Sequence, residues 1–433
     1  MSLIAQKLES ILDPSAVVPW EALAPDLKAQ ISLAAPKATI KCAVYPSSPE
    51  ELAEVVTCAD RNGWQMLPCG SGSKLHWGGV AEDVQLVVST AKLNRLLDHA
   101  SSDMTVTAEA GLRLADLQTT LNTTGQFLAV DPAYPHQASL GGVVATADTG
   151  ALRQRYGGVR DMLIGISFVR SDGKLAKAGG KVVKNVAGYD LMKLFTGSYG
   201  TLGILTQVTF RIYPLPPASR TMLLIGEASA LSQATAALLA SALTPTAITI
   251  LTPATVAALQ LGRAMGLLVQ FQSIEVSVAQ QSEQLTQLAE RLGLQAISIH
   301  SAEEADLWQR LREQIDSAPS EAAITCKIGV EPNRAVATLD QIQQMTDGLG
   351  VIHAGSGLGT IKLTEATSAM VLNLRQICQS QGGFLSIQAA PLLLKQALDV
   401  WGYPGNALAV MQRLKAQFDP KNLLNPHRFV GGI

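Results

Sequence analysis

The amino-acid sequence predicts a protein of the α+β class with two domains, and three observations lead to this prediction. The chain has 433 residues, which is long for one domain and sufficient for two. Segments with the apolar period of strands alternate with segments that have the period of amphipathic helices. Near the middle of the chain a proline cluster, Pro214-Leu215-Pro216-Pro217, interrupts this alternation and is typical of an exit from a domain.

The first half of the chain begins with a predicted helical segment, residues 1–38, and continues as the larger domain, residues 39–215. Ser48-Pro49-Glu50-Glu51 has the pattern of a helix N-cap followed by proline at the first position, and Asn62-Gly63 is typical of the helix end. Ser171-Asp172-Gly173-Lys174 predicts a hairpin turn. The expected strands lie at 65–67, 84–88, 105–111, 164–170 and 204–212, with a further helix at 114–123.

The second half predicts a smaller α+β domain over residues 216–415. Helices are expected at 228–242, 275–292 and 302–316, and strands at 266–274 and 295–299. The remaining residues, 416–433, contain the turn-rich stretch FDPKNLLNPHRF. The sequence shows no internal repeat.

Composition excludes several classes of protein. The net charge of −2 argues against a surface that binds nucleic acid. No apolar run is long enough to span a bilayer, and the N-terminus MSLIAQKLES predicts no signal peptide, so we expect a cytoplasmic protein. The five cysteines contain no C-x-x-C pair, and the six histidines have no ligand spacing. We therefore expect no metal site and no iron–sulfur cluster in this chain.

Four glycine-rich elements mark the first half: Gly70-Ser71-Gly72-Ser73, Gly141-Gly142, Gly179-Gly180 and GSYGTLGILT at 197–206. Glycine permits backbone conformations in which successive N–H groups converge on an anion, and a diphosphate needs several such groups. Gly70-Ser71-Gly72 and Gly355-Ser356-Gly357 do not complete the dinucleotide-binding pattern G-x-G-x-x-G, because Leu75 and Thr360 occupy the third glycine position. The nucleoside-triphosphate loop pattern is absent.

Several ordered motifs resemble the FAD-binding domain of the vanillyl-alcohol oxidase and p-cresol methylhydroxylase (PCMH) family. They are PCGSGSKLHWGG, AEAGLRLADLQ, SLGGVVATADTG followed by YGGVRD, and KVVKNVAGYDLMKLFTGSYGTLGILTQVTFRI. The final FDPKNLLNP is similar to the C-terminal signature of that family. Within the family, the chain looks like the FAD-binding E subunits of glycolate oxidases.

This resemblance implies a PCMH-type domain of two α+β subdomains that hold FAD, a ferredoxin-like second domain, and a tail that packs back on the FAD domain. Backbone groups of Gly70 to Leu75 would surround the pyrophosphate with help from the Ser71 and Ser73 hydroxyls, and Gly203 and Ile204 would face the flavin. We expect FAD to be bound non-covalently, because neither His76 nor Cys69 lies in a sequence pattern typical of covalent attachment to FAD. The expected cofactor residues are Pro68, Gly70, Ser71, Gly72, Ser73, Lys74, Leu75, His76, Pro132, Ser139, Gly141, Gly142, Thr146, Gly150, Gly203 and Ile204.

The stretch HAGSGLGTIKL, residues 353–363, allows more than one interpretation. In catalytic relatives that oxidise 2-hydroxy acids, this place resembles H-A-G-D-G-N-x-H. Here Ser356, Leu358 and Thr360 replace the aspartate, the asparagine and the second histidine. The first interpretation is a strand–turn–strand scaffold with reduced chemistry; the second keeps His353 as the one catalytic candidate, acting as a base.

The resemblance implies an oxidoreductase: the FAD-binding subunit of a glycolate oxidase (glycolate dehydrogenase) complex that converts glycolate to glyoxylate. Its partners would be a sister FAD subunit, an iron–sulfur subunit and a small 2-hydroxy acid. Any attachment to the inner membrane would be made through these partners. Two alternatives stay open: a stand-alone FAD-dependent dehydrogenase for D-lactate or glycolate, and a non-redox scaffold subunit that lost FAD.

Overall fold

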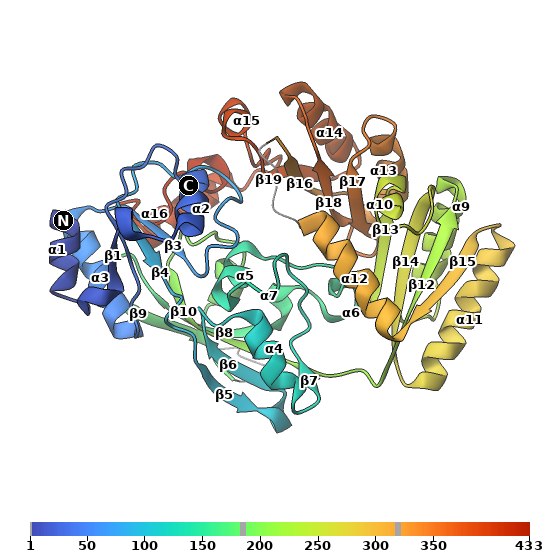
Figure 1. Cartoon of the computed structure of the whole chain (residues 1–433), viewed down its shortest axis with the longest axis horizontal. Coiled ribbons are helices and arrows are strands. Elements are labelled where there is room, and N and C mark those ends of the chain that lie inside the picture. The colour runs from blue at the N-terminus through green and yellow to red at the C-terminus, as the bar shows by residue number, and fades with distance from the viewer. Residues whose placement is uncertain (1, 182–187, 317–321) are drawn as a thin grey trace. The chain divides into compact units, whose positions relative to one another are not determined.

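The computed structural model describes residues 2–181, 188–316 and 322–433, so part of the predicted KVVKNVAGYD motif lies outside the described residues (Figure 1). The chain forms two compact units. The first contains Met1–Thr149, Gly158–Leu215 and Gly405–Ile433, and the second contains Gly150–Gly157 and Pro216–Pro404. The main boundary between the units, at Leu215 and Pro216, lies inside the cluster Pro214-Leu215-Pro216-Pro217.

The first unit contains a four-stranded sheet with the order β1-β2-β4-β3. Its strands are β1 (Val17–Pro19), β2 (Cys42–Val44), β3 (Met66–Cys69) and β4 (Leu86–Ser89). Because β2 and β3 both pair in parallel with β4, the carboxyl ends of all three strands lie at one edge of the sheet. The glycine loop 70–79 starts at that edge.

The helix that connects β2 to β3, α3 (Pro49–Asn62), has the predicted ends. The Ser48 hydroxyl accepts a hydrogen bond from the Glu51 N–H at 3.1 Å. At the other end Gly63 has a φ of +68°, the left-handed conformation that glycine adopts without strain. Local sequence signals therefore fix both ends of this helix.

The N-terminal residues differ from the prediction of a separate helical segment. Besides α1 (Leu3–Glu9) and α2 (Pro25–Ala34), they contain β1, which pairs with β2 at the edge of the first sheet. Leu8 and Ile31 are fully buried. Residues 1–38 belong to the first unit because they supply part of its core.

A second sheet of the first unit has five antiparallel strands in the order β5-β6-β10-β8-β9. Its strands are β5 (Leu96–Ala100), β6 (Thr105–Glu109), β8 (Leu163–Val169), β9 (Leu175–Gly179) and β10 (Ile204–Arg211). The predicted hairpin turn joins β8 to β9, with Gly173 at a φ of +81°. The remaining elements are α4 (Leu114–Asn122), α5 (Leu140–Thr146), α7 (Val159–Met162), α8 (Leu191–Phe195), α16 (Leu408–Phe418) and the pair β7 (Gln126–Phe127) and β11 (Tyr213–Pro214).

The second unit is built on one antiparallel sheet of eight strands in the order β15-β12-β14-β13-β17-β18-β16-β19. Each half has the ferredoxin-like βαββαβ connection and strand order, and the halves join through β13 and β17. The structure thus shows a duplicated topology that residue identities do not reveal. The strands are β12 (Ala218–Gly226), β13 (Ala247–Leu251), β14 (Met265–Ser273), β15 (Gln295–His300), β16 (Ile324–Gly329), β17 (Leu349–His353), β18 (Leu358–Leu363) and β19 (Phe384–Ala389).

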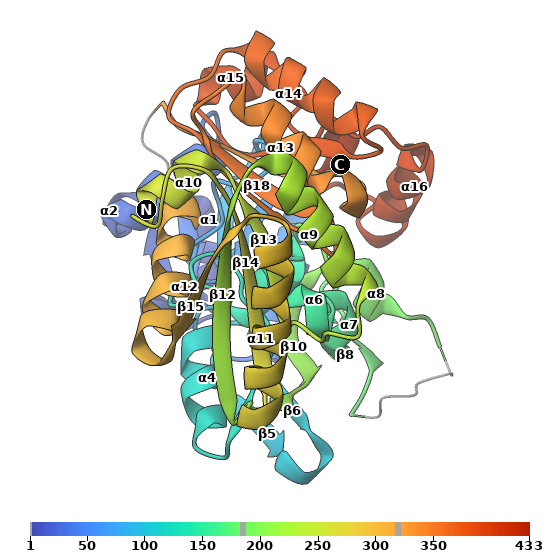
Figure 2. The same cartoon turned by 90° about the vertical axis from the view of Figure 1, so that its right-hand side faces the viewer.

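Helices cover one face of this sheet along its length. They are α9 (Ala228–Ala240), α11 (Glu275–Arg291), α13 (Ala335–Gln343) and α14 (Ser368–Ser380); Figure 2 shows α9 and α11 against β12 and β14. On the opposite face, α10 (Pro253–Ala258) and α12 (Ser301–Asp316) pack on apolar residues such as Leu223 and Leu268. Two short helices complete the unit: α6 (Arg153–Tyr156) and α15 (Leu392–Ala397).

Two boundaries differ from the predicted domains. The tail joins the first unit from Gly405, before the expected position 416, because α16 belongs to that unit. Residues Gly150–Gly157, predicted inside the first domain, cluster with the second unit because α6 contacts β13. No helix in the described ranges has both the length and the apolar character needed to cross a membrane.

Candidate functional site

A cavity of about 820 Å³, its open mouth included, lies in the first unit at the carboxyl ends of β3 and β4. Its walls come from the loop after β3, the N-terminal part of α5, the loop before β10, and the C-terminal tail. The lining residues are 68–75, Thr90, Ala138, Ser139, Gly141, Gly142, Ala145, Thr146, 198–200, 203–205, Asn425 and Arg428.

The loop after β3 presents unpaired backbone donors. Within the described residues, the N–H groups of Ser71, Gly72, Ser73 and Lys74 have no protein acceptor, whereas the Leu75 N–H bonds the Gly72 carbonyl at 3.1 Å. Gly72 and Lys74 are buried, so their N–H groups need a partner from a ligand or from water. Gly72 has a φ of +86°, which turns the backbone at this point. Such a loop is a nest for an anion.

Replacing Gly72 by alanine tests the nest. Alanine is strained at a φ of +86°, and its Cβ would lie 3.1 Å from Leu27, so the loop must shift. We expect the affinity for FAD, measured by fluorescence titration, to fall about tenfold. Gly63→Ala is the matched control, because Gly63 also has a positive φ, of +68°, but has open space around it. An equal loss of affinity in both variants would contradict the nest.

The wall of the cavity formed by Ser139 and α5 shows why glycine is required at positions next to Ser139. A Cβ on Gly70 would overlap the Ser139 Oγ, and a Cβ on Gly141 would lie 2.9 Å from that of Ala110. The Gly141 N–H donates to the Ala110 carbonyl at 2.7 Å, and the Gly142 N–H donates to the Ser139 Oγ at 3.3 Å. Both N–H groups are therefore already used by the protein, and these glycines act through close backbone approach.

The two hydroxyl groups of the loop differ in their contacts with the protein. The Ser71 hydroxyl donates to the Gln137 carbonyl at 2.5 Å, which ties the loop to the segment before α5. Its proton is therefore not available to a phosphate oxygen. The Ser73 side chain is partly exposed at the cavity.

Two buried cations stand beside the nest. Lys74 forms an ion pair with Asp148 at 2.5 Å, and the two side chains are 6% and 12% exposed. Arg428, at 3% exposure, donates from Nη2 to the carbonyls of Leu75 and Trp77 at 2.8 and 2.6 Å. Burial lowers the pKa of Arg428 to about 10, so the guanidinium stays charged at neutral pH. Cations next to unpaired N–H groups favour a negatively charged ligand.

The cavity brings together thirteen of the sixteen predicted cofactor residues. His76, Pro132 and Gly150 do not line it. Both ring nitrogens of His76 have protein partners, the Gln30 side chain at 3.1 Å and the Tyr134 hydroxyl at 3.3 Å. Pro132 is buried, and Gly150 clusters with the second unit. Contact of any of these residues with FAD stays a prediction.

Several cavity residues were not predicted: Thr90, Tyr199, Asn425 and Arg428. The FDPKNLLNPHRF motif marked the tail, but no residue in it was assigned to the site. Tyr199 and Asn425 have φ values of +53° and +47°, a backbone conformation that residues other than glycine rarely adopt. Asn425 could have been noted from the sequence, because it lies in the FDPKNLLNPHRF motif and asparagine adopts a positive φ more readily than most residues other than glycine.

The stretch HAGSGLGTIKL is a β-hairpin of the second unit, which confirms the strand–turn–strand interpretation. β17 ends at His353, β18 begins at Leu358, and these two residues are paired. A Cβ on Gly357 would overlap the Val330 carbonyl, and one on Gly359 would overlap the Val351 carbonyl. The glycines are therefore needed for the backbone of the hairpin itself.

His353 is partly buried, and its Nδ1 lies 3.1 Å from the Thr249 hydroxyl on β13. Burial lowers its pKa to about 4, so the ring is neutral at pH 7. A base of this pKa removes a proton weakly at neutral pH, where a pKa near 7 is most effective. Lys327 lies on the same face of the sheet as His353, paired across the strands with Thr360 and Ser386.

The lowered pKa of His353 makes stability depend on pH. The unfolded chain binds this proton below a pH of about 6.5, and the folded chain only near 4, so stability falls as the pH decreases through this window. We expect His353→Asn to lose less stability than the wild type between about pH 7 and about pH 5 in urea unfolding. An unchanged slope in His353→Asn would contradict the buried neutral ring.

Comparison with known proteins identifies the first unit. Residues 40–179 match the family described as the FAD binding domain, and residues 401–429 match the C-terminal domain of FAD linked oxidases. These two parts of the chain are similar to the FAD-binding and C-terminal domains of FAD linked oxidases. The cavity fits that assignment, because the nest and the two buried cations suit the diphosphate of FAD.

Solved structures show that the fold extends beyond the FAD-binding domain. A structure of p-cresol methylhydroxylase with substrate bound matches with a TM-score of 0.76 at 15% identity and covers 98% of this chain and 96% of its own. A 4-ethylphenol oxidase from Gulosibacter chungangensis matches with a TM-score of 0.75 at 16% identity, with the same coverage. These similarities establish the α+β fold of the PCMH flavoenzymes.

Curated relatives match over less than half of this chain, and this chain covers less than half of the length of each. The glycolate oxidase subunit GlcD of Bacillus subtilis (strain 168) is 31% identical over 184 residues, 42% of this chain and 39% of its own. A D-2-hydroxyglutarate dehydrogenase of Xanthomonas citri pv. viticola is 37% identical over 179 residues, 41% and 38%. The glycolate oxidase subunit GlcE of Escherichia coli (strain K12) is 34% identical over 174 residues, 40% and 49%.

Proposed function

We propose that this protein is an FAD-dependent oxidoreductase that works on small 2-hydroxy acids, as the FAD-binding subunit of a glycolate oxidase complex. The observation that carries the proposal is the cavity of the FAD-binding domain, with the unpaired N–H groups of residues 71–74 beside buried Lys74 and Arg428. The relatives that match this domain are named as glycolate oxidase subunits and 2-hydroxy-acid dehydrogenases. A sister flavoprotein and an iron–sulfur subunit would be its partners.

In this proposal FAD is held without a covalent bond. His76 uses both ring nitrogens within the protein, and it does not line the cavity. Cys69 lines the cavity, but burial raises the pKa of its thiol to about 12. The reactive thiolate is therefore scarce at neutral pH. Neither side chain has the chemistry of a tether.

Bound FAD would accept a hydride from the carbon that carries the substrate hydroxyl. A protein group must then accept the hydroxyl proton. His353 is the predicted base, but its low pKa makes it a weak one, and its neighbours in the 353–360 hairpin carry no second histidine or carboxylate. This supports a subunit that holds FAD and relies on its sister flavoprotein for oxidation of the substrate.

A stand-alone 2-hydroxy-acid dehydrogenase is the second candidate, and polar residues on one face of the sheet in the second unit favour it. His353, Thr360 and Lys327 lie on that face, on the adjoining strands β17, β18 and β16. A lysine ammonium can recognise a substrate carboxylate, and a neutral imidazole can accept a hydrogen bond from a hydroxyl. Under this alternative the chain would oxidise glycolate or D-lactate without partners.

Visible absorption of the purified chain, followed by anaerobic addition of glycolate and of D-lactate, tests the proposal. A yellow protein that keeps its colour with either acid supports the FAD-holding subunit. Bleaching by either acid contradicts that role and supports the stand-alone dehydrogenase. A colourless chain that cannot be reconstituted with FAD contradicts both and leaves the scaffold that lost FAD.

A further inference from the structure

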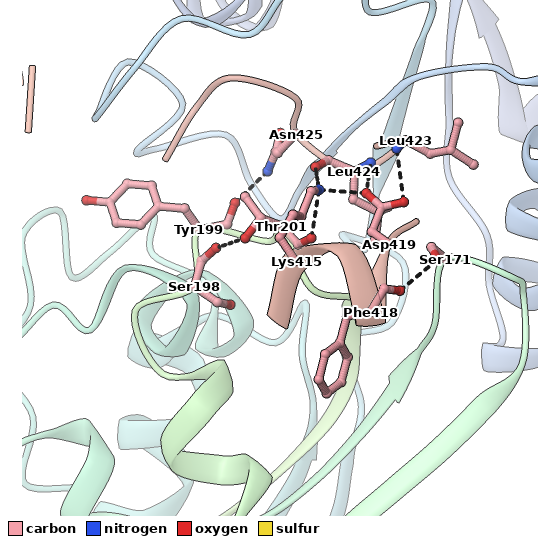
Figure 3. Close-up of polar contacts among 10 residues, drawn as sticks. All are labelled: Ser171, Ser198, Tyr199, Thr201, Lys415, Phe418, Asp419, Leu423, Leu424 and Asn425. Atoms are coloured by element: carbon pink, nitrogen blue, oxygen red, sulfur yellow. Dashed lines mark hydrogen bonds and ion pairs between the residues drawn. The ribbon is translucent and has the colours of Figure 1, made fainter. Parts of the chain in front are cut away.

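The C-terminal tail is held against the cavity by a buried ion pair, Lys415 with Asp419 (Figure 3). The two charged atoms lie 2.6 Å apart, and the side chains are 8% and 0% exposed. Neither residue lines the cavity. A buried pair is expensive to desolvate, and it contributes little to stability compared with apolar residues of similar volume. Its presence calls for a role other than general stabilisation.

The partners of the pair belong to two walls of the cavity. The Lys415 ammonium donates to the Thr201 carbonyl at 3.0 Å and to the Leu424 carbonyl at 2.9 Å. Thr201 follows the lining residues 198–200, and Leu424 precedes the lining residue Asn425. One ammonium group therefore fixes two segments that are more than two hundred residues apart in the sequence.

The carboxylate of Asp419 completes this arrangement. Its Oδ1 accepts from the Leu423 N–H at 3.0 Å, and its Oδ2 accepts from the Leu424 N–H at 2.8 Å. Asp419 therefore holds the tail through the N–H groups of Leu423 and Leu424, and Lys415 holds it through the Leu424 carbonyl. This leaves the backbone just before Asn425 little freedom to move.

The wall that this ion pair holds is strained. Tyr199 and Asn425 both have positive φ, and the Asn425 amide donates to the Tyr199 carbonyl at 2.6 Å. Such conformations cost about 1 to 2 kcal/mol each and persist where surrounding contacts over-determine them. The Lys415–Asp419 ion pair supplies such contacts next to Tyr199, at the Thr201 carbonyl, and next to Asn425, at the backbone of Leu424.

We propose that Lys415 and Asp419 are positioning residues for the cofactor: the buried pair fixes the 198–201 and 424–428 segments in the shape that binds FAD. The inference rests on the proposed binding of FAD in this cavity. The pair touches no cofactor atom and acts through Tyr199, Asn425 and the backbone beside them.

The test compares variants by FAD affinity, measured by fluorescence titration of the FAD-depleted full-length chain, and by thermal unfolding without FAD. Lys415→Met is expected to lower FAD affinity at least tenfold at temperatures where the chain is folded. The double variant Lys415→Met with Asp419→Asn removes both charges, so it folds even if the single variant does not. It should show the same loss because the Thr201 and Leu424 carbonyls lose their donor.

Two controls separate positioning from stability. Leu117→Ala in α4 leaves a cavity in a fully buried part of the same unit, so it should unfold earlier but keep its FAD affinity. Lys421→Met removes the exposed tail ion pair with Asp60 and should change neither quantity measurably. FAD affinity within about twofold of the wild type in both Lys415 variants would overturn the inference. A wild type that does not bind FAD would overturn the proposed function itself, and the inference with it.

Discussion

Replacing Arg428 by methionine is expected to destabilise the first unit by about 3 to 5 kcal/mol and to lower FAD affinity about a hundredfold. The guanidinium is buried and donates to the Leu75 and Trp77 carbonyls, which methionine would leave without their donor. The loop that carries the nest would lose two of its hydrogen bonds to the tail, while the bond from the Gly79 N–H to the carbonyl of residue 428 remains. Urea unfolding and fluorescence titration with FAD measure the two effects.

Arg428→Lys is the informative control for this prediction. Lysine keeps the positive charge, but its side chain is shorter and its ammonium does not reach the position of the Arg428 Nη2, which makes the fork of hydrogen bonds to the Leu75 and Trp77 carbonyls. If charge alone attracts the diphosphate, the lysine variant will bind FAD as the wild type does. If the loop must be held by the fork, the lysine variant will lose part of the affinity. Normal stability and FAD affinity in Arg428→Met would contradict the role of this residue.

Replacing Lys74 by methionine is expected to have the second large effect on stability and FAD affinity. The substitution leaves Asp148 buried beside the cavity without its cation, at a cost of about 3 kcal/mol. An uncompensated carboxylate beside the nest would also repel the diphosphate, so we expect FAD affinity to fall at least tenfold. Urea unfolding and FAD titration again measure both quantities.

An exposed ion pair provides the control for Lys74. Lys181 lies 3.0 Å from Asp98, with side chains that are 59% and 38% exposed. Because solvent screens this pair, Lys181→Met should change stability by less than about 1 kcal/mol and leave FAD affinity unchanged. If Lys74→Met changed stability and FAD affinity as little as Lys181→Met does, the Lys74–Asp148 pair would have no role in binding FAD.

The parts of the site that lie close together in the sequence could be predicted from it. The loop at 70–75 follows a strand and contains two glycines, so local conformational rules were sufficient to suggest a nest. The helix cap at Ser48 and the turn at Gly173 are local for the same reason. The 353–363 hairpin also followed from its glycines, whose role is steric.

The contribution of the tail could not be predicted in the same way. Arg428 reaches the Leu75 carbonyl across a separation of 353 residues, and Lys415 reaches the Thr201 carbonyl across 214. No periodic pattern indicates which distant segment a side chain will contact. The duplicated ferredoxin-like topology escaped detection for a related reason, since it is a property of strand order and many sequences can form it.

Titration of the FAD-depleted full-length chain with FAD tests the central claim most directly, when wild type and Gly72→Ala are compared under identical conditions. The account predicts that the wild type binds FAD and that the alanine variant binds about tenfold more weakly, with Gly63→Ala equal to the wild type. A wild-type chain that does not bind FAD, or equal binding by all three proteins, would contradict it.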